Sequence, residues 1–402
     1  MTIPITTFSI YVHYPFCIKR CSYCGFAAEV EKEDLAADYR RALLMELQRR
    51  LEEPAWRDGQ IETLYFGGGT PSLMPPEFVE RFINTLDGKW RPFELPPIPP
   101  NAQNLTLKTH YPEITLEANP KTRDVESFAA FRRAGVNRLS LGAQSFVPEE
   151  LSLLGRAHSV EEIYDAVRIA REAGFNNLSL DLIYGVPGQT VESFRRSVME
   201  ALNLGVDHLS CYTLSIEEGT PFHRAALDKR FPTPDPDMMA DQYAMLIELV
   251  CSIGFIHYEL TNYAKPGFQC CHNQVYWRRT PYLGIGAGAH SFDGRRRFWN
   301  RRDARAHITA VECRGDFFEG EEILTCENER EEELYLALRT TRGLTDQQAA
   351  SYCDPLALKE MEDGGYIIWE EGVWRMNEKK WLMLDEVVLR LMRKSDDSSA
   401  LI

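Results

Sequence analysis

The sequence lacks any run of about 18 consecutive apolar residues, so no transmembrane helix is expected. Its first residues, Met-Thr-Ile-Pro-Ile-Thr-Thr, lack the charged and apolar regions of a signal peptide. A surplus of basic residues is also missing: the formal net charge is −15, which argues against non-specific nucleic-acid binding. Because the ten cysteines come without a secretion signal, a reducing compartment is expected, with the cytoplasm as the default.

Three cysteines lie close together near the N-terminus, at Cys17, Cys21 and Cys24 in the run Cys-Ile-Lys-Arg-Cys-Ser-Tyr-Cys. No fourth cysteine lies near them in the sequence, since the next is Cys211. Three thiolates on one loop can hold three irons of a cubane iron–sulfur cluster, most of which take four cysteines. The remaining iron would be open to a non-protein ligand, which indicates chemistry or cofactor binding. A zinc site completed by His13 and plain buried thiols are the alternatives.

Strand-like and helix-like segments alternate from about residue 8 to 255. Six βα units in series predict an α/β fold in which a parallel sheet curls into an open, partial (β/α)6 barrel, since a closed barrel needs about eight units. The expected strands are Phe8–Tyr14, Thr63–Phe66, Ile114–Ala118, Arg138–Ala143, Asn177–Ile183 and His208–Leu214, and the expected helices span residues 34–51, 76–87, 124–134, 160–173, 190–204 and 236–253.

Three domains are predicted: the barrel at 1–255, an aromatic-rich extension at 256–320 and a small winged-helix-like C-terminal domain at 321–402. Because the C-terminal part is acidic, we interpret it as a packing or partner domain instead of a DNA-binding one. The proline-rich segment 87–112 reads as a surface insertion and is assigned no chemistry.

Polar and glycine-rich runs follow several of the expected strands. The cysteine loop follows the first strand, and Gly-Gly-Gly-Thr-Pro-Ser begins at Gly67 after the second. Glu117, Gln144 and Asp181 lie on or at the ends of later strands. Since ligands of parallel α/β folds bind at the carboxyl ends of the strands, we expect one site at that end of the barrel.

The pattern Tyr-x-His-x-Pro-Phe-Cys-x3-Cys-x-Tyr-Cys at residues 11–24, followed by Gly-Gly-Gly-Thr-Pro, resembles the radical SAM superfamily. More narrowly, it resembles the branch of oxygen-independent coproporphyrinogen III dehydrogenases and HemW-type heme chaperones, over nearly the whole chain. The resemblance implies that Cys17, Cys21 and Cys24 hold a [4Fe-4S] cluster whose open iron binds S-adenosylmethionine (SAM). The residues that it implies for SAM binding are Tyr11, Gly68, Gly69, Thr70, Glu117, Gln144, Arg156 and Asp181.

Some of these residues also have a physical rationale. Gly68 and Gly69 allow a close backbone approach, and the guanidinium of Arg156 suits a methionine carboxylate. Glu117 and Asp181 could instead be strand-end caps or salt-bridge partners.

A second motif, His-Asn-Gln-Val-Tyr-Trp beginning at His272, matches the His-Asn-x-x-Tyr-Trp pattern of HemW-type proteins. An imidazole can ligate heme iron, and Tyr276 and Trp277 could pack on the porphyrin. The alternative is a hydrogen-bonded structural histidine beside two core aromatics. Phe26 stands at the position of a fourth cysteine in the dehydrogenase, and in this it resembles HemW-type proteins. Gly25 stands where HemW-type proteins usually have Asp, and in this it resembles the dehydrogenase.

The leading functional prediction is a heme chaperone that binds the cluster, SAM and heme and delivers heme to hemoproteins. The alternative is an enzyme that oxidatively decarboxylates coproporphyrinogen III, and a third class is a zinc-stapled interaction protein. No catalytic residue is assigned, and no nucleic-acid partner is expected. If SAM is cleaved, an electron donor such as flavodoxin or ferredoxin is implied, and peripheral membrane association through partners is a further expectation.

A local basic patch lies within this otherwise acidic chain. Its guanidinium groups could pair with porphyrin propionates or with the acidic C-terminal domain. The patch comprises Arg278, Arg279, Arg295, Arg296, Arg297, Arg301 and Arg302.

Overall fold

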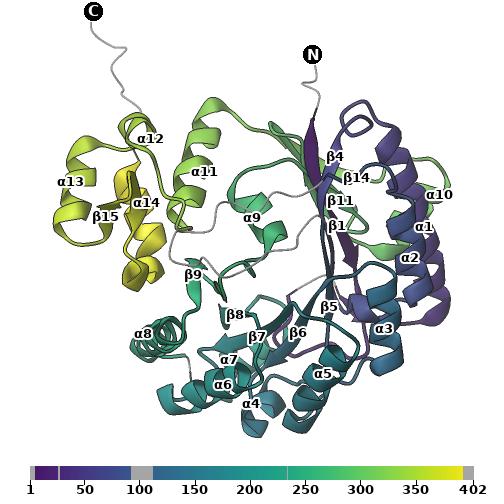
Figure 1. The fold of residues 1–402 in the computed structure, drawn as a ribbon, viewed down its shortest axis with the longest axis horizontal. Helices are drawn as coiled ribbons and strands as arrows, with labels where there is room; N and C mark the ends of the chain where they lie inside the picture. Colours follow the sequence, from purple (N-terminus) through teal and green to yellow (C-terminus); the bar gives the residue numbers. More distant parts are fainter. Residues whose placement is uncertain (1–4, 26–27, 92–111, 233, 393–402) are drawn as a thin grey trace, which may run out of the picture.

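The computed structural model describes residues 5–25, 28–91, 112–232 and 234–392 (Figure 1). Most of the predicted insertion at 87–112 therefore lies outside the described residues, as does Phe26. None of the described helices is long and apolar enough to cross a membrane.

Six parallel strands form the curved sheet that the alternating pattern predicts, in the order β1-β4-β5-β6-β7-β8. The α/β class and the partial (β/α)6 barrel are thus confirmed. The strands are β1 (Thr7–Tyr14), β4 (Gln60–Gly68), β5 (Glu113–Ala118), β6 (Arg138–Gln144), β7 (Leu178–Tyr184) and β8 (His208–Thr213).

Helices follow these strands and cover the outer side of the sheet (Figure 1). The main ones are α1 (Glu33–Glu52), α2 (Pro76–Asn84), α3 (Val125–Arg133), α5 (Val160–Glu172), α6 (Val191–Asn203) and α8 (Pro236–Ser252). Shorter elements are β2 (Phe16–Cys17), β3 (Glu29–Val30), η1 (Pro71–Leu73), α4 (Pro148–Leu153) and α7 (Pro221–Leu227).

Strand alternation gives the barrel an apolar outer face and a polar interior. On β1, Phe8, Ile10 and Val12 are fully buried in the main hydrophobic core, whereas Tyr11 between them faces the interior. Tyr11 lies directly opposite Tyr65 of β4 in the sheet register. The same alternation on the other strands lines the interior with hydroxyl and charged groups.

The predicted extension at 256–320 adds strands to both edges of this sheet, which has 12 strands within the described ranges. One edge receives β10 (Asn262–Ala264), antiparallel to β8, and then β9 (Ile256–Glu259), antiparallel to β10. At the other edge β11 (Tyr282–Ile285) lies parallel to β1 and is followed by β12 (His290–Phe292), β13 (Arg296–Asn300) and β14 (Phe318–Ile323).

Between these two sets of strands, the chain forms α9 (Cys271–Trp277), which carries the second motif. This helix lies inside the curve of the sheet, on the side opposite the outer helices (Figure 1). It contacts β4, so the motif is placed against the interior of the barrel.

The C-terminal part combines helices with a two-stranded hairpin, as predicted. Its Trp381 is buried and donates its indole N–H to the carbonyl of Leu338 within the same part at 2.8 Å. The Trp381 ring packs edge-on against His257 of β9, with 4.4 Å between the ring centres, and so joins this part to the rest. Its elements, together with the preceding α10 (Ala304–Glu312), are α11 (Cys326–Leu338), α12 (Asp346–Tyr352), α13 (Pro355–Asp363), β15 (Ile367–Glu370), β16 (Val373–Met376), η2 (Glu378–Met383) and α14 (Leu384–Leu391).

A buried carboxylate ties α1 to the added strands. Glu46 is fully buried and accepts hydrogen bonds from Gly286 N at 2.8 Å, His307 Nε2 at 3.0 Å and Asn300 Nδ2 at 2.6 Å. Buried acceptors and donors of this kind are costly to leave unpaired. Glu46 therefore fixes how the extension sits against the barrel.

Replacing Glu46 by Ala should lower the free energy of unfolding by about 3 kcal/mol, because three buried donors would lose their acceptor. Urea unfolding monitored by circular dichroism measures this loss. Glu52→Ala, an exposed change on the same helix, is the control and should stay within about 0.5 kcal/mol of the unmodified protein. Equal stability of the two variants would contradict this role of Glu46.

Candidate functional site

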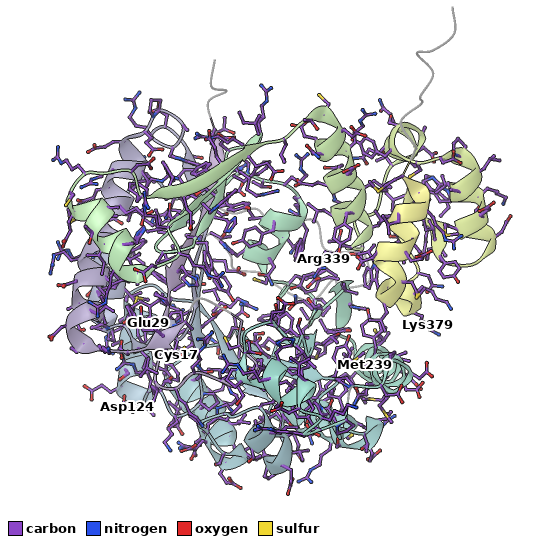
Figure 2. All side chains as sticks on the ribbon, turned by 180° about the vertical axis from the view of Figure 1, so that it is seen from behind. Cys17, Glu29, Asp124, Met239, Arg339 and Lys379 are labelled. Carbon is purple, nitrogen blue, oxygen red and sulfur yellow. The ribbon has the colours of Figure 1, made fainter. Side chains whose placement is uncertain are left out.

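The three predicted cluster cysteines lie on one loop at the carboxyl end of β1 (Figure 2 marks Cys17). Burial raises the pKa of the Cys17 thiol, and the nearby thiols of Cys24 and Cys21 raise it further, while the Thr70 hydroxyl lowers it. Within the described residues, no three His, Cys, Asp or Glu side chains converge closely enough to hold a single metal ion. The three thiols are thus electrostatic neighbours that do not meet at one point.

The glycine run after β4 lets this loop approach the sheet. A Cβ atom on Gly69 would lie 2.7 Å from the carbonyl oxygen of Phe16 and 3.0 Å from Cys17 Sγ. Gly69 also donates its N–H to Tyr14 O at 2.8 Å. Gly68 has a φ of +114°, which a side chain would strain. The spacing between loop and sheet therefore requires glycine at both positions.

A chain of polar contacts links the cysteine loop to the ends of β5 and β6. Arg156 donates to Cys21 Sγ at 3.2 Å, to Gly142 O at 2.9 Å and to the side-chain oxygen of Asn119. Asn119 in turn donates to Thr70 Oγ1 at 2.9 Å. The predicted residues Thr70 and Arg156 are thus brought together at the loop through Asn119, which was not among the predicted site residues.

The carboxylate of Glu117 lies inside the barrel. It accepts hydrogen bonds from Tyr65 Oη at 2.8 Å and from Gly68 N at 3.1 Å. Burial raises the pKa of Glu117 to about 7, although both donors and the cation of Arg138 oppose the shift. Glu117 is therefore poised between its neutral and ionised forms near neutral pH.

Gln144 and Asp181 are placed by the next two strands. Gln144 has a φ of +68° at a register shift between β6 and β7, a left-handed conformation that costs about 1–3 kcal/mol in a residue other than glycine. Such strain is common at functional sites. Asp181 accepts a hydrogen bond from Ser140 Oγ at 3.1 Å, and burial raises its pKa.

One cavity of about 200 Å³ inside the barrel joins the two predicted groups of residues. Three predicted SAM residues and two predicted heme residues line the same space, which the sequence assigned to separate ligands. The lining comprises Tyr11, Tyr65, Glu117, Arg138, Ser140, Asp181, Ser210, Tyr212, His272, Asn273 and Tyr276.

His272 is 1% exposed and hydrogen-bonded through both ring nitrogens. Its Nδ1 lies 2.7 Å from Thr63 Oγ1, and its Nε2 lies 2.9 Å from Tyr276 Oη. Burial lowers the pKa of His272 to about 3, and the charge of Arg138 contributes, so the ring is neutral. Coordination of iron by either nitrogen would require one of these hydrogen bonds to break.

Trp277 contacts the C-terminal part and is not part of the cavity lining. The guanidinium of Arg339, marked in Figure 2, lies 4.3 Å from the centre of the Trp277 ring, a cation–π contact. Arg339 also forms an ion pair with Glu259 at 3.4 Å. Trp277 therefore fixes the end of α9 against the neighbouring elements.

Several arginines of the basic patch pair with acidic residues. Arg279 and Arg297 lie 3.2 and 2.7 Å from Glu332 of α11, and Arg296 lies 3.0 Å from Glu321 of β14. These arginines therefore contact the acidic C-terminal part, which was the second of the two alternatives for the basic patch.

Comparisons with known proteins agree with this architecture. The sequence model of the Radical SAM superfamily matches residues 11–201. Heme chaperone HemW of Bacillus subtilis is 30% identical, over 94% of this chain and 97% of that protein. Heme chaperone HemW of Escherichia coli is 36% identical, over 70% of this chain and 69% of that protein.

A similar solved structure is the coproporphyrinogen III oxidase HemN of Escherichia coli, a radical SAM enzyme. It superposes with a TM-score of 0.79 and 25% identity, over 97% of this chain and 91% of that one.

The fold, the cysteine loop and the superfamily match define a radical SAM protein, a class that implies a [4Fe-4S] cluster and SAM. Within this class, the identity of 30 to 36% to relatives over 70 to 94% of this chain is decisive. The chain belongs to the family of HemW heme chaperones.

Gly69→Ala should displace the cysteine loop, because the added methyl group would clash with the backbone of the loop and with the Cys17 thiol. Overpacking of this kind costs about 1–3 kcal/mol of stability. We expect a lower iron content per chain after anaerobic reconstitution. Gly315→Ala is the control, since its Cβ would find ordinary contacts at 3.6 Å or more. Equal iron contents in the two variants would show that the close approach is not needed.

The raised pKa of Glu117 predicts how stability of the cluster-free protein depends on pH. Because the folded-state pKa of about 7 lies above the ordinary value of 4.5, ionisation is penalised in the folded state. The free energy of unfolding should therefore fall as pH rises from 5 to 8, by on the order of 3 kcal/mol from this group. Glu117→Gln should remove the part of this decrease in unfolding free energy that comes from Glu117, whereas the exposed change Glu126→Gln should keep it. Denaturant titrations between pH 5 and 8 measure the difference.

Proposed function

We propose that this protein is a cytoplasmic heme chaperone that binds a [4Fe-4S] cluster, SAM and heme and delivers heme to hemoproteins. The observation that carries the proposal is the similarity to heme chaperones, at 30 to 37% identity over 70 to 94% of this chain. The HemN enzyme is similar at 25% identity. Its TM-score of 0.79 keeps oxidative decarboxylation of coproporphyrinogen III as the second candidate.

Cys17, Cys21 and Cys24 would hold the cluster. Their position on one loop, pressed against Gly69 so that a Cβ would not fit, supports a site built to hold a cofactor close to the sheet. In the radical SAM class, the cluster supplies an electron to bound SAM. If SAM is cleaved, an electron donor such as flavodoxin or ferredoxin is required.

The surrounding side chains would hold SAM. Arg156, already fixed by Gly142 O and aimed at Cys21, would bind the methionine carboxylate with its fork of donors. Glu117 and Asp181 would accept hydrogen bonds from the ribose or the ammonium group, since their buried oxygens face the cavity. The remaining proposed contacts are Tyr11, Gly68, Gly69, Thr70 and Gln144.

Heme would bind at α9 through His272, Tyr276 and Trp277. His272 is a neutral imidazole, the form that ligates iron, although binding would replace its hydrogen bond to Tyr276 or to Thr63. Cys270 and Cys271 are less suited as ligands, because burial raises the pKa of both thiols and opposes thiolate formation. Nucleic acid is not a proposed partner, and any membrane association would occur through partner proteins.

Heme titration of the cluster-loaded protein tests the assignment. His272→Ala should shift the Soret band and weaken heme binding by about tenfold or more, because an iron ligand would be lost. His290→Ala, an exposed histidine on β12 outside the cavity lining, is the matched control. An unchanged affinity and Soret band would remove His272 as ligand.

Two activity assays separate the candidate functions. The loaded protein should transfer heme to an apo-hemoprotein, which absorbance of the recipient reports. An anaerobic assay with reductant, SAM and coproporphyrinogen III should give no protoporphyrinogen. Turnover in that assay would contradict the chaperone proposal and support the enzyme.

A further inference from the structure

Arg138 on β6 is a buried cation that faces the cavity. Its side chain is 1% exposed and contributes to the cavity lining. No described residue forms a hydrogen bond or an ion pair with its guanidinium, and its Nε is buried without a partner. The other buried guanidinium at the site, that of Arg156, has three partners.

The carboxylates around Arg138 are engaged elsewhere. Glu113 accepts hydrogen bonds from the backbone of α9, Glu117 from Tyr65 and Gly68, and Asp181 from Ser140. They act on the guanidinium only from a distance. Burial lowers the pKa of Arg138, but the negative charge of Glu113 and other neighbours more than offset this, so the group stays charged.

These distant charges offset the cost of removing Arg138 from water, but its buried Nε–H still lacks an acceptor, and a buried donor left unsatisfied costs free energy. A carboxylate is the ligand group that matches a guanidinium best, through two parallel hydrogen bonds. The open face of Arg138 is therefore suited to a carboxylate that enters the cavity.

The size of the cavity limits what can enter. Its volume is about 200 Å³. Pockets that enclose a whole organic ligand are larger, at about 300–1,000 Å³. Tyr212, which lines the cavity, is 42% exposed, so the lining includes a residue that is in contact with solvent. The cavity therefore suits one arm of a larger ligand.

We propose that Arg138 binds a carboxylate arm of a ligand inside the barrel, at a site separate from the one at Arg156. The expected source is a propionate of heme held at α9, since Tyr276 and His272 line the same cavity. This source rests on the proposed function. The methionine part of SAM carries the same chemical group and is the second source that the experiment distinguishes.

Two pairs of ligands test the proposal with the cluster-loaded protein: heme against heme dimethyl ester, and SAM against decarboxylated SAM. The unmodified protein should bind heme more tightly than its ester, and Arg138→Gln should reduce that preference about tenfold or more, the usual effect of a charged hydrogen bond. Arg138→Lys keeps the charge without the fork and should lose part of the preference. Arg196→Gln, an exposed change on α6 outside the cavity lining, should keep it.

Circular dichroism confirms that each variant is folded before binding is compared. Loss of the preference for SAM over decarboxylated SAM, with the heme preference kept, would assign the carboxylate to SAM and support the site. If folded Arg138→Lys and Arg138→Gln leave both preferences unchanged, the proposal is overturned. If the unmodified protein binds no heme, the proposed function fails, and the SAM pair alone decides about Arg138.

Discussion

The arrangement of the site depends on one interaction, the binding of the α9 backbone by the carboxylate of Glu113. Glu113 begins β5 and accepts the N–H groups of Cys271 and His272, each at 3.0 Å. This anchors a seven-residue helix inside the curve of the sheet, where Thr63 holds His272 from β4. The size of the cavity and the enclosure of Arg138 follow from that placement, because α9 fills part of the barrel.

A polar interior is the second constraint. Strand alternation directs the apolar residues to the outer helices, so the inward positions are free to carry Tyr11, Glu117, Arg138 and Asp181. Burying a charge costs free energy, and two groups next to the proposed cofactor site show this cost. Glu117 has a pKa near 7, and the Nε of Arg138 lacks a partner. The interior is therefore prepared for charged ligands.

The sequence predicted the six barrel strands well, with observed bounds that differ by a few residues. The alternation of strand-like and helix-like segments, the cysteine spacing and the glycine run are local signals, and they placed the cysteine loop and the glycine run at the ends of strands. The extension was less predictable: its strands join both edges of one sheet, which no local pattern reports. Asn119 and Arg138 were missed as site residues because their importance depends on a neighbour from another strand, Arg156 for Asn119 and the cavity for Arg138. Alternate residues of β6 face the barrel interior, and this alternation was the signal that could have identified Arg138.

By itself, the sequence determined the fold class, the loop of Cys17, Cys21 and Cys24, and the family, because cysteine spacing and the succession of strand-like and helix-like segments are properties of local sequence. Only the tertiary structure decided that His272, some 250 residues from that loop, lines the same cavity as Tyr11 and Glu117. Strand order and register bring distant residues together, and burial then changes their chemistry: it makes the His272 ring neutral and leaves Arg138 as a charge without a partner. Such properties arise from packing between segments, which single stretches of sequence do not encode.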